Sequence, residues 1–331
     1  MKRFMNEPAD FVRDMLEGVA LANPDTLEYV PEFNLIRRKA GPSDGRVSLI
    51  QGSGSGHEPA HAMLVGPGML DGACPGDVFA APPLEYVLGA TRSLRTPAGV
   101  VYIVNNYTGD RMVFEMASEV VRAEGIDVRT VLVDDDVAVK DSTYTVGRRG
   151  IAGNFFVIKA MGAAAAAGAP IDEVVRIGEA VNAATRSMGM ALTSCSPPAK
   201  GAPLFALGES EVELGVGIHG EPGRQRTTLS SADQTVEVLL GAILAEHDVN
   251  RGDEVAVMVN GLGATPINEL YILYGSAHKQ LRERGIQVRR NYVGDYCTSL
   301  DMAGVSITVV KLTDEIERLL SEPAQIPIRV F

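Results

Sequence analysis

The feature that most constrains the fold is an alternation of short apolar runs with a longer amphipathic pattern. The runs at 46–52, 99–106 and 128–136 are rich in Val and Ile, and each ends in Gly, Asn or Asp. The segment 110–125 repeats its apolar residues at helical spacing and finishes on Gly125, a residue suited to a helix C-cap. This order is typical of α/β layering around a largely parallel sheet flanked by helices. In such sheets, ligands usually bind in loops at the carboxyl ends of the strands.

The second half of the chain repeats the alternation after a break. A helical pattern at 172–188 leads into 189–203, a segment that contains three prolines, so a domain boundary is expected after residue 187. A smaller α/β domain is predicted beyond it, with a helix at 231–247 and strands at 253–263, 286–294 and 305–313. The chain is therefore predicted to form an N-terminal α/β domain over 1–187 and a C-terminal one over 188–331.

Composition and charge exclude several classes of partner. The 331 residues carry a formal net charge of −12, which argues against nucleic acid or an anionic membrane surface as the main target. The N-terminal stretch has charges throughout and does not resemble a signal peptide, and no apolar run is long enough to span a bilayer. The three cysteines are far apart and form no CxxC pair, which is typical of a reducing compartment. A cytoplasmic protein is expected.

The stretch GSGSGHEPAH at 52–61 contains a pattern found in zinc proteases. In HExxH sequences, two histidines one helical turn apart bind the metal and the glutamate acts as a base. Here Pro59 lies inside the pattern, and a proline is tolerated only in the first turn of a helix. His57 would then lie at or before the helix start, so the two histidines are not expected to share a face. No metal site is predicted.

The glycines of the same stretch fit neither common phosphate-binding pattern. A Walker A loop needs GK[ST] after its glycines, and a dinucleotide fingerprint needs GxGxxG, whereas this loop has GxGxG followed by His57. Two interpretations stay open. The glycines form a tight turn between a strand and a helix, or their unshielded N–H groups hold an anion or a polyhydroxy ligand.

Three further segments carry side chains that could do chemistry. Asp110 in NYTGD, at the start of a helical pattern, is interpreted either as an N-cap or as a base for a substrate hydroxyl. His219 in GVGIHGEPG is interpreted either as a turn histidine or as an accessible nucleophile. The aspartates at 134–136 alternate in direction and cannot all face one ion, so this run is interpreted as a solvated or partner-facing loop.

Taken together, these segments resemble the substrate-binding subunit of dihydroxyacetone kinase, the DhaK family. The resemblance runs nearly end to end, and its long motifs in a fixed order are highly specific. The matching stretches are GSGSGHEPAHAMLVGPGMLDGACPGDVFAAP (52–82), NYTGD (106–110), DDDVAVKDSTYTVGRRG (134–150), LGVGIHGEPG (214–223), LGATPINELY (262–271) and YCTSLDMAGVSIT (296–308).

The resemblance implies a role for each candidate residue. His219 would bind the ketone carbon of a short ketose covalently, as a hemiaminal. His57 would hydrogen-bond the substrate and act in acid–base steps, and Asp110 would accept the proton of the terminal hydroxyl as phosphate arrives. Close contacts from the loop would come from Gly54, Ser55 and Gly56.

The resemblance also implies partners. No cofactor is expected on this chain, because the family's magnesium–nucleotide sits on a separate helical DhaL-type subunit. In the phosphotransferase-system version, a DhaM-type phosphocarrier recharges that nucleotide from phosphoenolpyruvate. The family subunit is usually a homodimer. The sequence leaves the choice between ATP and phosphoenolpyruvate as ultimate donor open.

One position departs from the family pattern. A lysine is expected just before NYTGD, and this sequence has Asn105, which is counted among the substrate-binding residues. The change leaves the ketose open between dihydroxyacetone and a four-carbon tetrulose such as erythrulose. A regulatory paralogue that binds the ketone and acts as a coactivator is a further alternative, although His57, Asp110 and His219 together favour catalysis.

Overall fold

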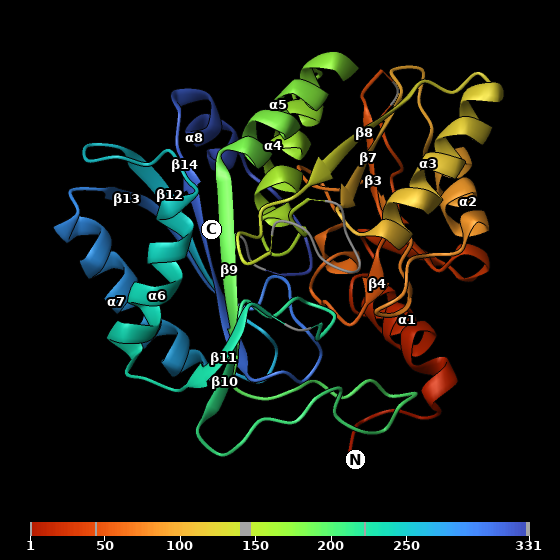
Figure 1. The fold of residues 1–331 in the computed structure, drawn as a ribbon. Helices are drawn as coiled ribbons and strands as arrows, with labels where there is room; N and C mark the ends of the chain where they lie inside the picture. The colour runs from red at the N-terminus through yellow and green to blue at the C-terminus, as the bar shows by residue number, and fades with distance from the viewer. Residues whose placement is uncertain (1, 44, 140–146, 222, 329–331) are drawn as a thin grey trace.

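Two six-stranded sheets, one in each half of the chain, form the framework of the computed structural model (Figure 1). The structure describes residues 2–43, 45–139, 147–221 and 223–328. Residues 140–146 of the expected motif 134–150 and Pro222 of GIHGEPG therefore lie outside the described residues.

The first sheet is parallel at its centre and antiparallel at one edge. In spatial order it contains β1 (Leu27–Val30), β2 (Leu35–Arg38), β5 (Gly72–Ala73), β3 (Ser48–Gln51), β7 (Val100–Asn105) and β8 (Val128–Val133). The pairs β5–β3, β3–β7 and β7–β8 are parallel, whereas β1–β2 and β2–β5 are antiparallel. The expected α/β fold with a largely parallel N-terminal sheet is confirmed. In β3 and β7 every side chain is buried, as expected for central strands of a parallel sheet covered on both faces, whereas β8 at the sheet edge is buried only in part.

Helices cover both faces of this sheet. They are α1 (Phe11–Ala22), α2 (Leu84–Leu94), α3 (Thr108–Ala123), α4 (Asn154–Ala166) and α5 (Ile171–Ala183). The apolar sides of α2 and α3 share a core with β3 and β7. The alanine-rich α4 is buried nearly all round and lies between the two sheets (Figure 1), where Phe156 packs edge-on against Tyr292 of the second sheet. Its small side chains let the neighbouring elements approach closely.

The second sheet is mostly antiparallel. Its order is β11 (Gln225–Thr228), β10 (Glu211–Leu214), β9 (Thr185–Ala191), β14 (Gly304–Lys311), β12 (Glu254–Gly261) and β13 (Gln287–Gly294). Among these pairs only β12–β13 is parallel. The helices α6 (Ala232–Ala245) and α7 (Ile267–Glu283) cover one face, and α8 (Asp314–Ser321) packs against α4.

The remaining elements are short. A two-stranded parallel sheet pairs β4 (Gly54–Ser55) with β6 (Gly76–Val78). The 3-10 helices are Pro8–Asp10, Pro31–Phe33 and Ala62–Leu64. No helix in the described parts of the chain is long and apolar enough to cross a membrane.

The helix expected to run to residue 188 was predicted too long. It ends at Ala183, and β9 begins at Thr185. The residues from Thr185 onward pair with β14, and this long-range pairing outweighs the local helical pattern. The domain division after residue 187 stays a prediction, and it falls within β9.

Two of the three aspartates in the run 134–136 are buried, so the expected solvated loop is wrong for them. Asp135 and Asp136 are both 0% exposed. The Asp135 carboxylate accepts hydrogen bonds from the backbone N–H groups of Ile151 and Gly153, and Asp136 pairs with Arg149. The acidic run itself could not reveal this, because its cation Arg149 and the N–H donors Ile151 and Gly153 lie 13 to 18 residues further along the chain.

Candidate active site

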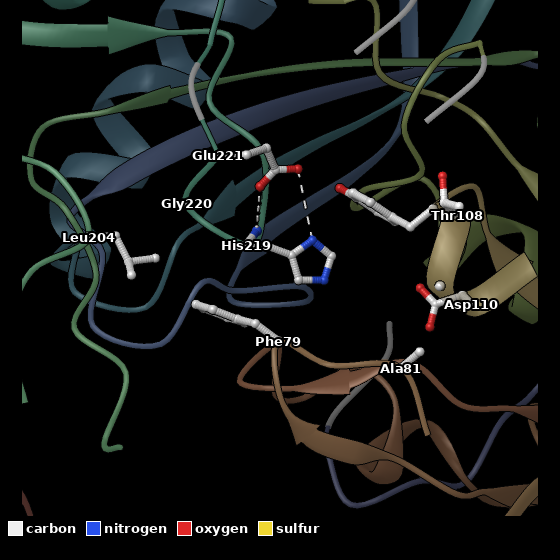
Figure 2. Close-up of a pocket in the computed structure, with 10 residues that line it drawn as sticks. Phe79, Ala81, Thr108, Asp110, Leu204, His219, Gly220 and Glu221 are labelled. Atoms are coloured by element: carbon white, nitrogen blue, oxygen red, sulfur yellow. Dashed lines mark hydrogen bonds and ion pairs between the residues drawn. The ribbon is translucent and has the colours of Figure 1, made fainter. Parts of the chain in front are cut away.

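A cavity of about 580 Å³ is lined by residues from both halves of the chain (Figure 2). Its walls are formed by Phe79, Ala81, Tyr107, Thr108, Gly109 and Asp110 from the first half and by Leu204, His219, Gly220 and Glu221 from the second. The NYTGD and GIHGEPG motifs, more than 100 residues apart in the sequence, therefore line the same space. A cavity between two halves of a molecule is a common place for a small ligand.

Close packing against Phe79 explains why positions 54 and 56 of the loop are glycine. A Cβ on Gly54 would lie 2.7 Å from the Phe79 Cα, and one on Gly56 would lie 2.8 Å from the Phe79 ring. Gly56 also has φ +97°, a conformation that side chains disfavour. Its N–H donates to the Glu58 carboxylate, and Ser55 Oγ donates to a backbone carbonyl at 2.7 Å. A contact between the loop 54–56 and a substrate stays a prediction.

His57 is fully buried, and one contact assigns its tautomer. Nδ1 lies 2.9 Å from the carbonyl oxygen of Thr298. A carbonyl can only accept, so Nδ1 carries the hydrogen and Nε2 presents a lone pair. Nε2 has no hydrogen-bond partner among the described residues. Burial, reinforced by the nearby His219 and His61, lowers the pKa of His57 well below its usual value, which keeps the ring neutral.

His61, the second histidine of the HExxH pattern, does not share a helical face with His57. Residues 57–61 form turns, and the two rings are 6.4 Å apart between centroids at 72°. Among the described residues, no group of three or more His, Cys, Asp and Glu is arranged to hold a metal ion.

Asp110 is a buried carboxylate on the cavity wall and does not cap its helix. The N-cap of α3 is Tyr107, and Asp110 lies in the first turn with 3% of its surface exposed, so the capping interpretation is wrong. Its Oδ2 accepts a hydrogen bond from Ser53 Oγ at 3.1 Å, whereas Oδ1 has no partner among the described residues. Burial raises the pKa of Asp110 to about 7, against the opposing effects of His219 and Ser53. A carboxylate with this pKa suits a general base near neutral pH.

His219 stands among three aromatic rings with one edge toward the cavity. Its centroid lies 4.4 Å from Tyr107, 4.7 Å from His57 and 5.5 Å from Phe79, each nearly perpendicular. The side chain is 17% exposed, so a small molecule can reach it.

Glu221 orients the His219 ring from the opposite side. One carboxylate oxygen accepts a hydrogen bond from the His219 backbone N–H at 2.9 Å, and the other lies 3.8 Å from Nδ1. Nδ1 therefore faces the carboxylate, and Figure 2 shows Nε2 on the other edge, facing the space shared with Asp110. Nε2 is thus placed to act on a molecule in the cavity.

The structure places Asp110 and His219 on the cavity wall and His57 against the His219 ring, but neither His57 nor Asn105 is among the residues that line the cavity. Asn105 is fully buried at the end of β7, where its Oδ1 accepts a 3.4 Å hydrogen bond from Asn154. Its Nδ2 has no partner among the described residues.

Sequence reasoning missed three residues around the histidines. All three lie inside the quoted stretches, and Tyr107 and Glu221 stand within three residues of ones that were singled out. Phe79, whose ring stacks on His57 at 5.3 Å, lies 22 positions later, and no local pattern links the two. The only sequence evidence that could have found these three residues is that they lie in the same motifs as the candidate residues.

Comparison with known families gives one match over most of the chain. A family model described as the Dak1 domain matches residues 17–328. A curated relative from Listeria innocua is 45% identical over 95% of this chain and 95% of its own length. It is named PTS-dependent dihydroxyacetone kinase 1, dihydroxyacetone-binding subunit DhaK.

Two further comparisons bear on the alternatives. A protein of Mycolicibacterium smegmatis named L-erythrulose 1-kinase is 41% identical over 99% of this chain, which spans 58% of that protein. A solved structure described as dihydroxyacetone kinase operon co-activator Dha-DhaQ superimposes with a TM-score of 0.89 at 33% identity, covering 96% of this chain and 97% of that one.

Proposed function

Because the chain belongs to the Dak1 domain family, we propose that it is the ketose-binding subunit of a dihydroxyacetone kinase. The observation that carries the proposal is that Asp110 and His219 line one cavity, while the buried ring of His57 packs against His219 at 4.7 Å between centroids. His219 and Asp110 offer a nucleophile and a base to the same space, and His57 adds an acceptor nitrogen beside His219. The relatives that bear the kinase name are subunits of phosphotransferases, and phosphoryl transfer is the activity proposed here.

The first step is covalent capture of the ketose by His219. The lone pair of Nε2 attacks the ketone carbon, an N–C bond forms, and the carbonyl π pair moves to oxygen. That oxygen takes a proton from solvent, and the Nδ1 proton passes to solvent on the side of Glu221, which gives a neutral hemiaminal. Glycerol has no carbonyl carbon, so this step accepts short ketoses and rejects glycerol.

The second step is activation of the terminal hydroxyl. Asp110 is the base, because its raised pKa of about 7 lets it take a proton near neutral pH. His57 presents a lone pair on Nε2 and accepts a hydrogen bond from a substrate hydroxyl. Phosphoryl transfer then depends mainly on positioning and on charge neutralisation around the phosphate.

The phosphate comes from a partner in this proposal. A DhaL-type subunit carries the magnesium–nucleotide, and a DhaM-type phosphocarrier recharges it from phosphoenolpyruvate. Three of the curated relatives that support this carry phosphotransferase-system or phosphoenolpyruvate dependence in their names. A homodimer and a cytoplasmic location remain predictions.

Two alternatives have specific support. Asn105 in place of the expected lysine, together with the similarity to an L-erythrulose 1-kinase, favours a tetrulose as the ketose. The similarity to a co-activator structure favours a ketone sensor. The buried Asp110 weighs against the sensor, because binding a ketone needs no general base.

Two measurements on the purified chain test the proposal. Intact mass under gentle ionisation is recorded with dihydroxyacetone, erythrulose and glycerol, and the ketoses are expected to give an adduct that glycerol does not. Phosphorylation is then followed with a DhaL-type partner, supplied either with ATP or with phosphoenolpyruvate and the phosphocarrier. The absence of any ketose adduct would refute the capture step. An adduct without phosphorylation by either donor would identify a sensor.

A further inference from the structure

A buried arginine connects the acidic run 134–136 to the candidate nucleophile. Arg149 is 0% exposed, and its Nη2 lies 2.6 Å from Asp136 Oδ2 and 2.7 Å from the carbonyl oxygen of Gly215. Its Nη1 lies 3.6 Å from Glu221 Oε1, the oxygen that faces Nδ1 of His219 at 3.8 Å. Asp136, Arg149, Glu221 and His219 therefore form a continuous chain of charged and polar groups.

Two carboxylates, Asp136 and Glu221, are buried next to Arg149, and the second of them needs an explanation. Removing charges from water is costly, and one acid would be enough to pair with Arg149. Asp136 already does so, with two short contacts to the guanidinium. Glu221 is the additional charge, and its side chain is 8% exposed. A charge retained at such a cost is better explained by its contact with His219 than by stability.

Glu221 is held in its ionised form. Burial alone would raise the pKa of Glu221, but the hydrogen bond and charge of His219 and the charge of Arg149 lower it to about 2. The carboxylate is therefore negative throughout the neutral range and presents only acceptor oxygens to the ring.

The tautomer of His219 decides whether Nε2 can act as a nucleophile. A neutral imidazole carries its hydrogen on one nitrogen only, and the other holds the lone pair. A carboxylate beside Nδ1 favours the hydrogen there and so leaves the lone pair on Nε2, which faces the cavity (Figure 2). With the hydrogen on Nε2 instead, the ring could not attack a carbonyl carbon.

We propose that Arg149, anchored by Asp136, is a positioning residue that holds Glu221 against His219 and thereby fixes the tautomer with a free Nε2 lone pair. The inference rests on the proposed capture of a ketose by His219. During capture the imidazole gains positive charge as the N–C bond forms, and the Nδ1 proton then leaves toward Glu221. Arg149 does not touch the substrate; it acts through the carboxylate.

Two readouts separate this role from a merely structural one. Nitrogen-15 NMR of histidine-labelled protein identifies which ring nitrogen of His219 is protonated, with His219→Asn used to assign its signals. Native mass spectrometry gives the association constant of the dihydroxyacetone adduct. In the wild type, Nδ1 should be protonated and the adduct should form.

Three variants change the chain of contacts at different points. Glu221→Gln and Arg149→Met are each expected to shift His219 toward the Nε2-protonated form. These contacts are electrostatic, at 3.6 and 3.8 Å, and their loss is expected to lower the adduct association constant about 10- to 100-fold. Arg149→Lys keeps the positive charge and should recover most of that loss. The matched control is Arg148→Gln, because Arg148 pairs instead with Glu246 and does not line the cavity.

Arg149→Met leaves the buried Asp136 without its cation and could prevent folding. The double variant Arg149→Met/Asp136→Asn removes both charges, and it is expected to show the same tautomer shift and the same loss of adduct. Wild-type tautomer and wild-type adduct constant in the folded double variant and in Glu221→Gln would overturn the proposal. If the wild type formed no adduct while the variants still shifted the tautomer, the proposed capture would fail and the positioning role would stand.

Discussion

His57 donates its Nδ1 hydrogen to the carbonyl oxygen of Thr298, 2.9 Å away and 241 residues later in the chain. The backbone completes the contact, because the N–H of Thr298 donates to the carbonyl oxygen of His57 at 3.1 Å. The next contact, from the N–H of Leu300 to the oxygen of Gly56 at 2.8 Å, holds the glycine loop against the same segment. A loop from the first half of the chain is thus fixed in place by the second half, and the free nitrogen of His57 is determined by that contact.

Replacing His219 should abolish covalent capture. His219→Ala removes the only ring to which we assign the N–C bond, so its intact mass with dihydroxyacetone should equal that of the free protein. His278→Ala is the matched control, because His278 is exposed on α7 and away from the cavity lining. A persistent adduct in His219→Ala would show that another group binds the ketose.

Replacing Asp110 should separate capture from transfer. Asp110→Asn keeps the shape of the side chain but cannot accept a proton, so the adduct should form while turnover falls by about 10²- to 10⁴-fold. The measurement is steady-state phosphorylation with the partner subunit, alongside the adduct mass. Turnover near the wild-type rate would exclude Asp110 as the base.

The pH dependence of kcat/KM should report the same group. The base is active when deprotonated, and the pKa of Asp110 in the folded chain is about 7, so the wild-type rate should rise with pH through about 7. The residual kcat/KM of Asp110→Asn should not rise with pH around 7. A step of the same size and position in the variant would assign it to another group.

Asp110 should also lower the stability of the folded chain at neutral and alkaline pH. A carboxyl group whose pKa is raised from 3.8 to about 7 binds its proton more tightly when folded, so stability falls as pH rises from about 4 to about 7 and stays low above that. Asp110→Asn should therefore raise the free energy of unfolding by a few kcal/mol at pH 8, from about 1.4 kcal/mol per pKa unit, and have little effect near pH 4. Denaturant unfolding at both pH values measures it.

The control for this stability measurement is Asp77→Asn at an exposed position. An exposed carboxylate keeps its hydration on folding, so the free energy of unfolding of this variant should change little at either pH. Equal stability of Asp110→Asn and wild type at pH 8 would contradict a buried, unpaired charge at Asp110.

The glycine loop should tolerate no added methyl group where it meets Phe79. Gly54→Ala places a Cβ 2.7 Å from backbone atoms that cannot move independently, and overpacking of this kind typically costs about 1–3 kcal/mol. Gly18→Ala in α1 is the control, because nothing lies within 4 Å of the added Cβ and alanine favours helix by about 1 kcal/mol. Thermal unfolding of the two variants should therefore shift in opposite directions, and a neutral Gly54→Ala would show that the loop can relax.

Much of the fold could be predicted because its signals are local. The types of side chain in three apolar runs are enough to predict the strands β3, β7 and β8. The spacing of apolar residues within one segment is enough to predict the helix α3. The start of β9 was missed because Thr185 is held by its pairing with β14, more than 100 residues away. The burial of Asp136 was missed for the same reason, since its partner Arg149 lies outside the acidic run.

The sequence by itself determined which chemical groups are available: two histidines beside glycines, an aspartate at a helix start, and motifs in an order that identifies the family. Only the tertiary structure decided what state those groups are in. Burial sets the pKa of Asp110, Thr298 sets the tautomer of His57, and Glu221 faces Nδ1 of His219. Protonation depends on desolvation and on neighbours in space, and folding brings in neighbours that no local stretch of sequence contains.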